Sequence, residues 1–342
     1  MMSCLKSRSI FRALCSPIQN KWFDLCRNVN QSALDSDLKK ENILTNIADP
    51  PPTLGQTPPN LRQKINKMDF NNQTLSTLML QVKSRKMRKK SNLMYFEGKL
   101  ILKEALENGI DPLAVFFSRT DDIKSFKFSE NTKLYKMPYN EMKMWSDLTT
   151  PPGIVAVCKK PSVTKVDKPD IPVTIICDNV REPGNLGALI RNTVGAGAKD
   201  VILSKGCVDA WDPKVIRGSS GTLFRLSVLD NIDWPDMKSY IHKDALLLVA
   251  TNKFSLKESS TPNNSCVVPY YEVDYCNYPS ICIIIGGETE GISENALELM
   301  SFYDNKMINI PLSNEVESLN SVSALSIILF EIKRQIMRNK GP

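Results

Sequence analysis

The C-terminal half of the chain alternates short, almost unbroken apolar runs with longer amphipathic stretches. The runs are rich in β-branched residues, which is typical of strands covered on both faces in a parallel sheet. They are Val173–Cys177, Val201–Leu203, Leu223–Val228, Leu246–Ala250, Ile281–Ile285 and Met307–Ile310. The stretches between them predict helices at Leu186–Ala196, Pro235–Lys243, Glu294–Phe302 and Ser318–Arg338. This alternation indicates an α/β domain, which we place at residues 173–342.

A second folded region is predicted at residues 73–160. Its pattern predicts a helix over Glu97–Asn108 that ends at Gly109, because glycine tolerates the left-handed backbone of a helix C-terminus. Strands are predicted at Leu113–Phe117 and Ile154–Cys158. Residues 161–172 place prolines among lysines, so we expect them to connect the two regions.

The first 72 residues differ from both folded regions. The first 30 carry five basic residues and one acidic residue between apolar positions, as mitochondrial transit peptides do. We assign residues 1–47 to such a peptide; a disordered basic tail is the alternative. Residues 48–72 contain two proline clusters and are predicted to be a linker. The expected location is the mitochondrial matrix.

Composition narrows the class of protein. A chain of 342 residues with 42% hydrophobic residues has room for two packed domains and is not wholly disordered. No apolar run approaches the ~20 residues of a membrane helix. One histidine, His242, and nine cysteines without a C-x-x-C pair argue against a bound metal and for reduced, mostly buried thiols. The net charge of +7 fits a polyanionic partner or simple solubility.

Polar, glycine-containing segments follow three of the predicted strands. An open parallel sheet binds its ligands where the loops leave the carboxyl ends of its strands. The first segment runs from Asn185, a predicted helix N-cap, to Arg191 in the second helical turn. The second is Gly286–Gly291, and the third extends from Ile310 to Asn320. Neither the dinucleotide pattern G-x-G-x-x-G nor a phosphate-loop pattern is present, which excludes both nucleotide-binding classes.

Together these three segments resemble the SpoU (TrmH-like) RNA 2′-O-ribose methyltransferases of the SPOUT class. The matching motifs are N-x-G-x-x-x-R ending at Arg191, G-x-E-x-x-G over Gly286–Gly291, and I-P followed by S-L-N ending at Asn320. Residues Trp211–Gly221 are also similar to the family. Lys86–Gly109 resembles the substrate-binding domain that precedes the catalytic domain in many members. With its basic N-terminus, the chain is most similar to the mitochondrial rRNA ribose methyltransferases.

The resemblance implies an architecture and a set of ligands. It implies a trefoil-knotted SPOUT domain with a mostly parallel sheet, preceded by a small α/β RNA-binding domain similar to ribosomal protein L30e. Pattern alone predicts no knot, because chains rarely thread loops. It further implies a homodimer that binds S-adenosylmethionine, with no membrane span and no metal. The implied cofactor contacts are Gly286, Ile310 and Leu319, and the implied catalytic residues are Arg191, Asn185, Glu288, Ser318 and Asn320.

The chemistry constrains these roles. Methyl transfer to ribose needs the 2′-hydroxyl in line with the sulfonium methyl group, and its proton must be removed. The family's proposed base is the arginine of the first motif. A guanidinium rarely gives up its proton, so we assign Arg191 to phosphate and ribose and leave the base open. Ser318 and Asn320 bind the nucleotide, arrange Arg191 or cap the last helix. Glu288 orients these donors, accepts the proton or caps the helix at Glu294.

A run of six cations opens the first folded region. It predicts phosphate contacts with RNA, although a solvated helix face is the alternative. Tyr95 and Phe96 either stack on an unpaired base or are buried. The cations are Lys83, Arg85, Lys86, Arg88, Lys89 and Lys90.

The predicted function is methylation of a ribose 2′-oxygen in mitochondrial rRNA, and the resemblance suggests a guanosine of the large subunit. A tRNA methyltransferase and a non-catalytic RNA-binding assembly factor are the alternatives. Two departures from the family bear on the cofactor. Asn314 stands where glycine is usual, and asparagine tolerates the left-handed conformation. Thr289 replaces a frequent glycine in the second motif.

Overall fold

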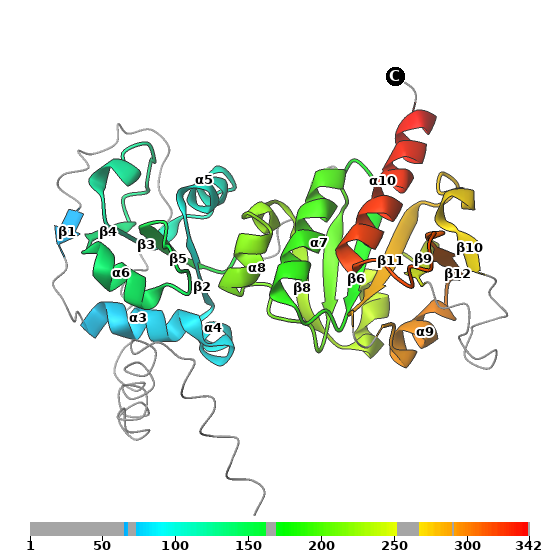
Figure 1. Ribbon diagram of the computed structural model, residues 1–342, viewed down its shortest axis with the longest axis horizontal. Helices are drawn as coiled ribbons and strands as arrows, with labels where there is room; N and C mark the ends of the chain where they lie inside the picture. The colour runs from blue at the N-terminus through cyan, green and yellow to red at the C-terminus, as the bar shows by residue number, and fades with distance from the viewer. Residues whose placement is uncertain (1–64, 68–72, 162–168, 252–266, 289–290, 341–342) are drawn as a thin grey trace, which may run out of the picture.

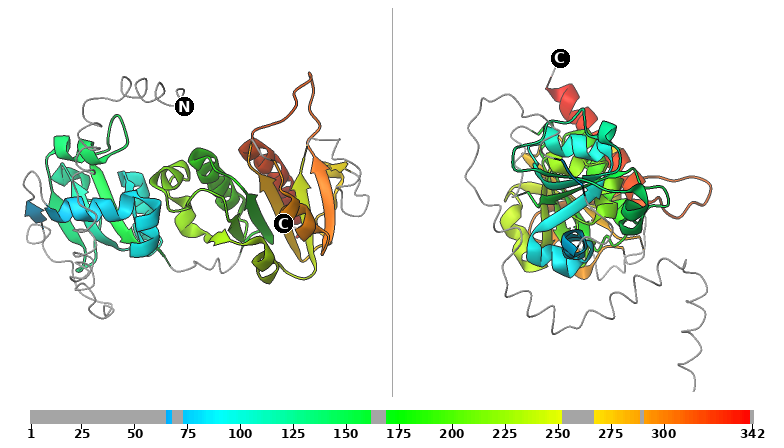
Figure 2. Two further views of the ribbon diagram at one scale, coloured as in Figure 1. Left: turned by 90° about the horizontal axis from the view of Figure 1, so that it is seen from below. Right: turned by 90° about the vertical axis from the view of Figure 1, so that its left-hand side faces the viewer.

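The computed structural model describes residues 65–67, 73–161, 169–251, 267–288 and 291–340. The predicted transit peptide and most of the predicted linker lie outside these ranges. Figure 1 shows two folded regions side by side, with the short helix α8 (Pro213–Gly218) at the junction. Figure 2 shows the same two-part arrangement from below. Within the described ranges, no helix combines the length and the apolar character needed to cross a membrane.

The N-terminal region is a five-stranded sheet with helices on both faces. The strand order is β1-β4-β3-β5-β2, in which β1, β4 and β3 are parallel and β5 is antiparallel to both neighbours. The strands are β1 (Ile65–Lys67), β2 (Leu93–Glu97), β3 (Pro112–Phe117), β4 (Lys133–Lys136) and β5 (Ile154–Lys159). The helices are α3 (Gln73–Lys83), α4 (Arg85–Ser91), α5 (Lys99–Glu107) and α6 (Tyr139–Trp145), with a 3-10 turn η4 (Thr120–Asp122). Helices α3 and α6 pack on one face of the sheet and α5 on the other.

Two predictions for this region need correction. Glu97 ends a strand rather than starting the helix, because Gly98 at φ 108° separates β2 from α5. Residues 65–67, predicted as linker, form strand β1 beside β4. A three-residue edge strand is held by backbone hydrogen bonds and needs no apolar pattern. Gly109 follows the end of α5 at φ 72°, as predicted.

The C-terminal region is built on a seven-stranded sheet whose strands are all parallel. The order is β10-β12-β9-β11-β6-β7-β8. The strands are β6 (Val173–Asp178), β7 (Asp200–Ser204), β8 (Ser227–Ile232), β9 (Ala245–Ala250), β10 (Val267–Pro269), β11 (Ser280–Gly286) and β12 (Asp304–Asn309). The helices are α7 (Pro183–Ala196), α8, α9 (Glu294–Met300) and α10 (Ser321–Asn339), with 3-10 segments η5 (Thr222–Arg225), η6 (Trp234–Tyr240) and η9 (Tyr270–Glu272). Helices α7 and α10 cover one face, and α9 and η6 cover the other.

This sheet confirms the predicted α/β class with a mostly parallel sheet. The trefoil knot and the likeness to ribosomal protein L30e stay predictions. Three local predictions were wrong. The apolar run 223–228 divides between η5 and β8, and the helix predicted at 235–243 is the 3-10 segment η6. The N-cap of α7 is Glu182, not Asn185, because Pro183 lacks an N–H and takes the first helical position.

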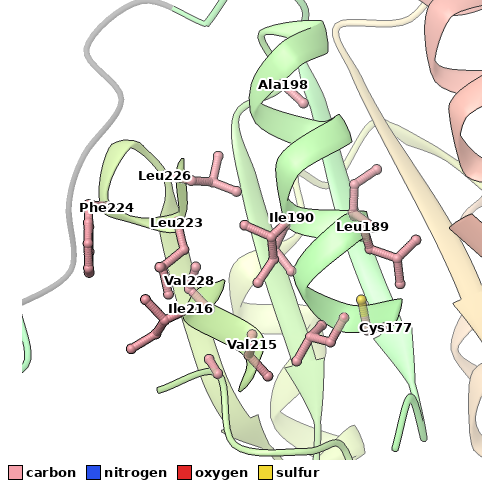
Figure 3. Close-up of a cluster of buried hydrophobic side chains, with 14 of the residues drawn as sticks. Cys177, Leu189, Ile190, Ala198, Val215, Ile216, Leu223, Phe224, Leu226 and Val228 are labelled. Atoms are coloured by element: carbon pink, nitrogen blue, oxygen red, sulfur yellow. The ribbon is translucent and has the colours of Figure 1, made fainter. Parts of the chain in front are cut away.

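One apolar core runs through both regions. Figure 3 shows Ile190 of α7 packed toward the side chains of α8, η5 and β8, with Leu189 on the opposite side of the helix, toward Cys177 of β6. Phe224 of η5 extends from this cluster to Phe96 of β2, with ring centroids 5.5 Å apart. Ile171, predicted as connector, is fully buried and donates its N–H to Gly197. The two regions therefore contact each other through packed side chains and not only through the connecting segment.

Candidate active site

The three motif segments lie at the same edge of the parallel sheet. They follow β6, β11 and β12, whose carboxyl ends share one edge because all the strands are parallel. Strands β6 and β11 are neighbours, and β9 separates β11 from β12. After β12 the chain returns to α10, which packs against α7 and β11. The segment 310–320 therefore ends beside the other two.

One side chain from each segment meets in a hydrogen-bonded cluster. Asn185 donates from Nδ2 to Oε1 of Glu288 at 2.9 Å. Asn320 donates from Nδ2 to the same carboxylate oxygen, and its Nδ2 lies 3.5 Å from Oδ1 of Asn185. Asn320 and Glu288 are exposed and Asn185 is half-buried, so the cluster is open to a ligand. The predicted convergence of the three segments is confirmed at these residues.

The cluster side chains also hold local structure. Oδ1 of Asn320 accepts the N–H of Val322 at 2.9 Å, which makes Asn320 the N-cap of α10. Its capping and its place in the cluster are compatible because they use different atoms. Glu288 does not cap α9; Oγ of Ser293 does, by accepting the N–H of Ala296 at 3.3 Å.

The glycine segment after β11 is fixed by a buried carboxylate that the sequence analysis missed. Asp178, at the end of β6, accepts the N–H of Ser293 on Oδ2 at 2.6 Å and the N–H of Gly287 on its carbonyl at 2.9 Å. A Cβ at Gly287 would lie 2.6 Å from the carbonyl oxygen of Asn179, and one at Gly286 would collide with the carbonyl of Gly291. Only glycine fits at these positions. An acid that ends an otherwise apolar strand was the available signal.

The predicted cofactor contacts and their neighbour Asn309 combine apolar side chains with an unpaired acceptor, which fits S-adenosylmethionine. Ile310 and Leu319 are half-buried, and Ile310 packs against the main core. The buried Oδ1 of Asn309 has no hydrogen-bond partner, so it is an acceptor suited to a ligand N–H or O–H. Asn314 adopts φ 57°, as expected for a residue in place of glycine. These groups fit a ligand with an apolar body and at least one hydrogen-bond donor.

Two predicted catalytic residues lie outside the cluster. Arg191 is six residues beyond Asn185 on α7, which corresponds to about 9 Å along the helix and about 240° around it. Its Nη1 donates to Oγ of Ser220 at 3.2 Å, and its side chain is exposed. Ser318 is exposed in the segment before α10. Within one chain, the structure does not bring Arg191 to Asn185, Glu288 and Asn320.

Helices α7 and α10 are joined by a polar contact that the sequence analysis also missed. Asn192 donates from Nδ2 to Oγ of Ser326 at 2.6 Å. Asn192 lies seven residues after Asn185 and thus on nearly the same side of α7. The contact fixes the helix that carries Asn185 against the helix that Asn320 caps. Small polar residues inside apolar helices were the only sequence signal.

The predicted RNA-binding run is divided by the fold. Arg85, Lys86, Lys89 and Lys90 are exposed, and Lys83 pairs with Asp147 at 3.1 Å. Arg88 is 1% exposed and bound to carboxylates of the C-terminal region. The prediction that Arg88 contacts phosphate is therefore wrong, because the fold encloses its guanidinium. Tyr95 and Phe96 are each 1% exposed core residues, which excludes base stacking and confirms the buried alternative.

Thiols and metal ligands offer no second site in the described ranges. Four of the described cysteines are buried, and burial raises the pKa of each thiol, to about 12 for Cys282. They are protonated and unreactive at neutral pH, which agrees with the prediction of reduced core residues. Among the described residues, no three histidine, cysteine or acidic side chains group as metal ligands would.

Comparison with known proteins gives concordant matches. The model of the SpoU rRNA Methylase family matches residues 172–330. The protein "rRNA methyltransferase 3, mitochondrial" of Mus musculus is 35% identical over 302 residues, which covers 77% of this chain and 72% of that relative. The "23S rRNA (guanosine(2553)-2′-O)-methyltransferase RlmP" of Bacillus subtilis is 25% identical over 250 residues, covering 73% and 92%.

Solved structures share the fold over both regions. The crystal structure of an AdoMet-bound rRNA methyltransferase from Sinorhizobium meliloti aligns with a TM-score of 0.65 at 19% identity. The alignment covers 80% of this chain and 99% of that chain. The likeness therefore includes the N-terminal region as well as the parallel sheet.

Proposed function

The chain belongs to the SpoU rRNA methylase family, and we propose that it transfers a methyl group from S-adenosylmethionine to a ribose 2′-oxygen of mitochondrial rRNA. The observation that carries the proposal is the cluster of Asn185, Glu288 and Asn320, in which three separate strand ends meet. The name of the mouse relative supports both the rRNA substrate and the mitochondrial location. The expected compartment is the matrix, where mitochondrial ribosomes are assembled.

Backbone groups at Gly286, Ile310 and Leu319 would hold the cofactor, beside the free acceptor of Asn309. When bound, S-adenosylmethionine supplies an electrophilic methyl group on a positively charged sulfur. A Cβ at Gly286 would collide with the carbonyl of Gly291, so this position offers backbone groups and has no room for a side chain. The structurally similar S. meliloti protein binds the same cofactor, AdoMet, in its crystal structure.

The cluster's contribution to the reaction is the placement of the ribose. The amide groups of Asn185 and Asn320 are oriented by their bonds to Glu288, so they present fixed polar atoms to the 2′- and 3′-hydroxyls. Holding the hydroxyl in a near-attack position can supply roughly 7–11 kcal/mol of the barrier. Glu288 is the carboxylate within this cluster, and we assign it the proton of the 2′-hydroxyl. Arg191 contacts the adjoining phosphate through its guanidinium fork.

We propose that the site is completed in a homodimer, in which Arg191 of one subunit reaches the cluster of the other. Two observations support this. Arg191 lies on a different side of α7 from Asn185. Helix α10 also leaves an apolar stripe exposed, with Ile327, Phe330 and Met337 at 37%, 48% and 37% exposure. Burying such a stripe against a second copy removes it from water.

Subunit mixing tests the composite site. Arg191→Ala and Asn320→Ala are each expected to be inactive alone. If sites are shared, a mixed dimer contains one site with both residues intact, so co-refolding the two variants restores about a quarter of the wild-type rate by simple statistics. Sites contained in one chain predict no recovery. Sedimentation analysis of each variant checks that it still dimerises.

Mapping of ribose methylation in cells identifies the target nucleotide. The B. subtilis relative is named for a guanosine 2′-oxygen of 23S rRNA, which supports a guanosine of the large-subunit rRNA here. Ribose methylation is mapped across mitochondrial RNAs in cells that carry the wild-type chain, Arg191→Ala or the control Lys199→Ala, an exposed cation at the far end of the sheet. Loss of one rRNA mark with Arg191→Ala alone supports the proposal. Loss of a tRNA mark, or of none, contradicts it.

A further inference from the structure

Helix α4 carries its cations on two different sides. At 100° per residue, Arg85, Arg88 and Lys89 share one side, and Lys86 and Lys90 lie on another. The first side faces the C-terminal region, because Arg88 at its centre binds Asp209 and Asp212. The charges of Arg85 and Lys89 also act on Asp230 of β8. Lys86 and Lys90 are exposed to solvent. The run is therefore divided: Arg88 is buried against the other region, Arg85 and Lys89 lie exposed at the edge of this junction, and Lys86 and Lys90 are exposed on the other side of the helix.

The guanidinium of Arg88 is the centre of the inward side. Nε donates to Oδ2 of Asp209 at 2.9 Å, and Nη2 donates to Oδ2 of Asp212 at 2.9 Å. Nη1 donates to the carbonyls of Val82 and Lys83, at the end of α3. A buried cation with both carboxylates and two carbonyls in place is well compensated, whereas loss of one partner leaves a costly unpaired charge.

The acids that receive α4 form a surface that we call the acidic ledge, made of Asp209, Asp212 and Asp230. Lys160 lies 4.0 Å from Asp209 and adds a further cation at this junction. Burial raises the pKa of Asp230, and repulsion from Asp209 adds to this effect. Three acids gathered on one side and cations on the other make the junction specific for this orientation of the two regions.

The acidic ledge is fixed relative to Arg191. Oδ1 of Asp212 caps α8 by accepting the N–H of Lys214 at 3.0 Å. Helix α8 then packs directly on α7, where a Cβ at Gly187 would lie 2.6 Å from the carbonyl oxygen of Val215. Ser220, just beyond α8, binds Arg191. Docking of α4 on the ledge thus sets where the N-terminal region stands relative to the catalytic arginine.

We propose that Arg88 is a positioning residue that holds the phosphate contacts of Lys86 and Lys90 at a fixed separation from Arg191. The RNA-binding part of this inference rests on the proposed function. RNA that reaches both regions then gains affinity because its second contact is already in register with the first. Arg88 itself touches no phosphate.

The remaining contacts between the regions limit the expected effect. Arg225 of η5 forms an ion pair with Glu104 of α5, and Phe224 packs on Phe96. Without Arg88 the two regions stay in contact, but their relative orientation is no longer held in a single arrangement. Helix α8 stays in place on α7, so the orientation of Arg191 is preserved.

The test compares two RNA fragments by fluorescence anisotropy at several salt concentrations. The long fragment reaches both regions, and the short one covers only the cluster of Asn185, Glu288 and Asn320. Arg88→Gln is expected to weaken binding of the long fragment about tenfold with an unchanged salt slope, and to leave the short fragment unaffected. The pair Lys86→Gln with Lys90→Gln removes two phosphate contacts and makes the slope shallower by about 1.4. In methyl-transfer assays Arg88→Gln raises the KM for long RNA about tenfold and leaves kcat unchanged.

A second variant distinguishes loss of positioning from misfolding. Arg88→Gln combined with Asp209→Asn leaves no unpaired buried charge between these two side chains and is expected to show the same tenfold loss. A shallower salt slope with Arg88→Gln, an equal loss on both fragments, or no loss on the long fragment would each overturn the inference. A wild-type chain that binds both fragments yet transfers no methyl group contradicts the proposed function alone. One that binds neither contradicts both.

Discussion

Gly187 tests how closely α7 and α8 must approach for the site to form. In Gly187→Ala the new Cβ would lie 2.6 Å from the carbonyl oxygen of Val215 and 2.8 Å from Cα of Gly218. The optimum for non-bonded carbon atoms is about 3.5–4.0 Å, so the overlap is roughly 1 Å. Both neighbouring atoms belong to backbone, which moves only if the helix moves. The substitution therefore pushes α8 away from α7.

The magnitude follows from two opposing terms. Overpacking of this kind costs about 1–3 kcal/mol, while replacing a helical glycine by alanine returns about 0.5–1 kcal/mol. We expect a net loss of about 1–2 kcal/mol in the free energy of unfolding. The matched control is Gly195→Ala on the same helix, where no atom lies within 4 Å of the new Cβ. There only the favourable term acts, so the chain gains about 0.5–1 kcal/mol.

Thermal unfolding followed by tryptophan fluorescence reports both variants. At 2–4 °C per kcal/mol for regions of this size, Gly187→Ala lowers Tm by about 4 °C and Gly195→Ala raises it by about 2 °C. Because the displacement also moves Ser220, which binds Arg191, only Gly187→Ala is expected to lower kcat. If both variants raise Tm and keep full activity, the two helices are not in backbone contact and the reasoning fails.

Three further outcomes are expected. Glu288→Ala removes the shared acceptor of the cluster and lowers kcat/KM at least tenfold. Its Tm changes by no more than about 1 °C because the side chain is exposed. An unchanged rate would exclude a catalytic role for Glu288. Asp178→Asn deprives the N–H of Ser293 of a charged acceptor worth about 1.5–3 kcal/mol. Titration calorimetry should then show cofactor affinity reduced about tenfold. Unaltered affinity would refute the role of Asp178 in shaping the cofactor site. Burial raises the pKa of Asp230, so the folded chain binds that proton more tightly than the unfolded chain and the ionised form is destabilising. Asp230→Asn should therefore raise Tm at pH 7, with a gain that shrinks as the pH falls through the raised pKa; a gain independent of pH would show another cause.

The central strands were predictable because burial on both faces leaves a continuous apolar run in the sequence. Strands β1, β2, β4 and β10 were not predicted. Of these, β1 and β10 are three-residue edge strands, which depend on backbone pairing and carry no such run. The apolar run 223–228 was predicted as one strand, yet its first half forms η5. Phe224 in this first half packs on Phe96 of the other region. The hydrophobic pattern does not distinguish such a contact from a position in the sheet.

The sequence by itself determined the α/β class, the three motif segments and their family, because periodicity, turn residues and spacing are local properties of the chain. Only the tertiary structure decided which groups meet. It joined Asn185, Glu288 and Asn320 while placing Arg191 apart, and it turned Arg88 from a predicted phosphate ligand into a buried ion-pair partner. The carboxylates that bind Arg88 lie more than 120 residues further along the chain. The role of a charge is set by its neighbours in space, and these follow from the packing of distant segments.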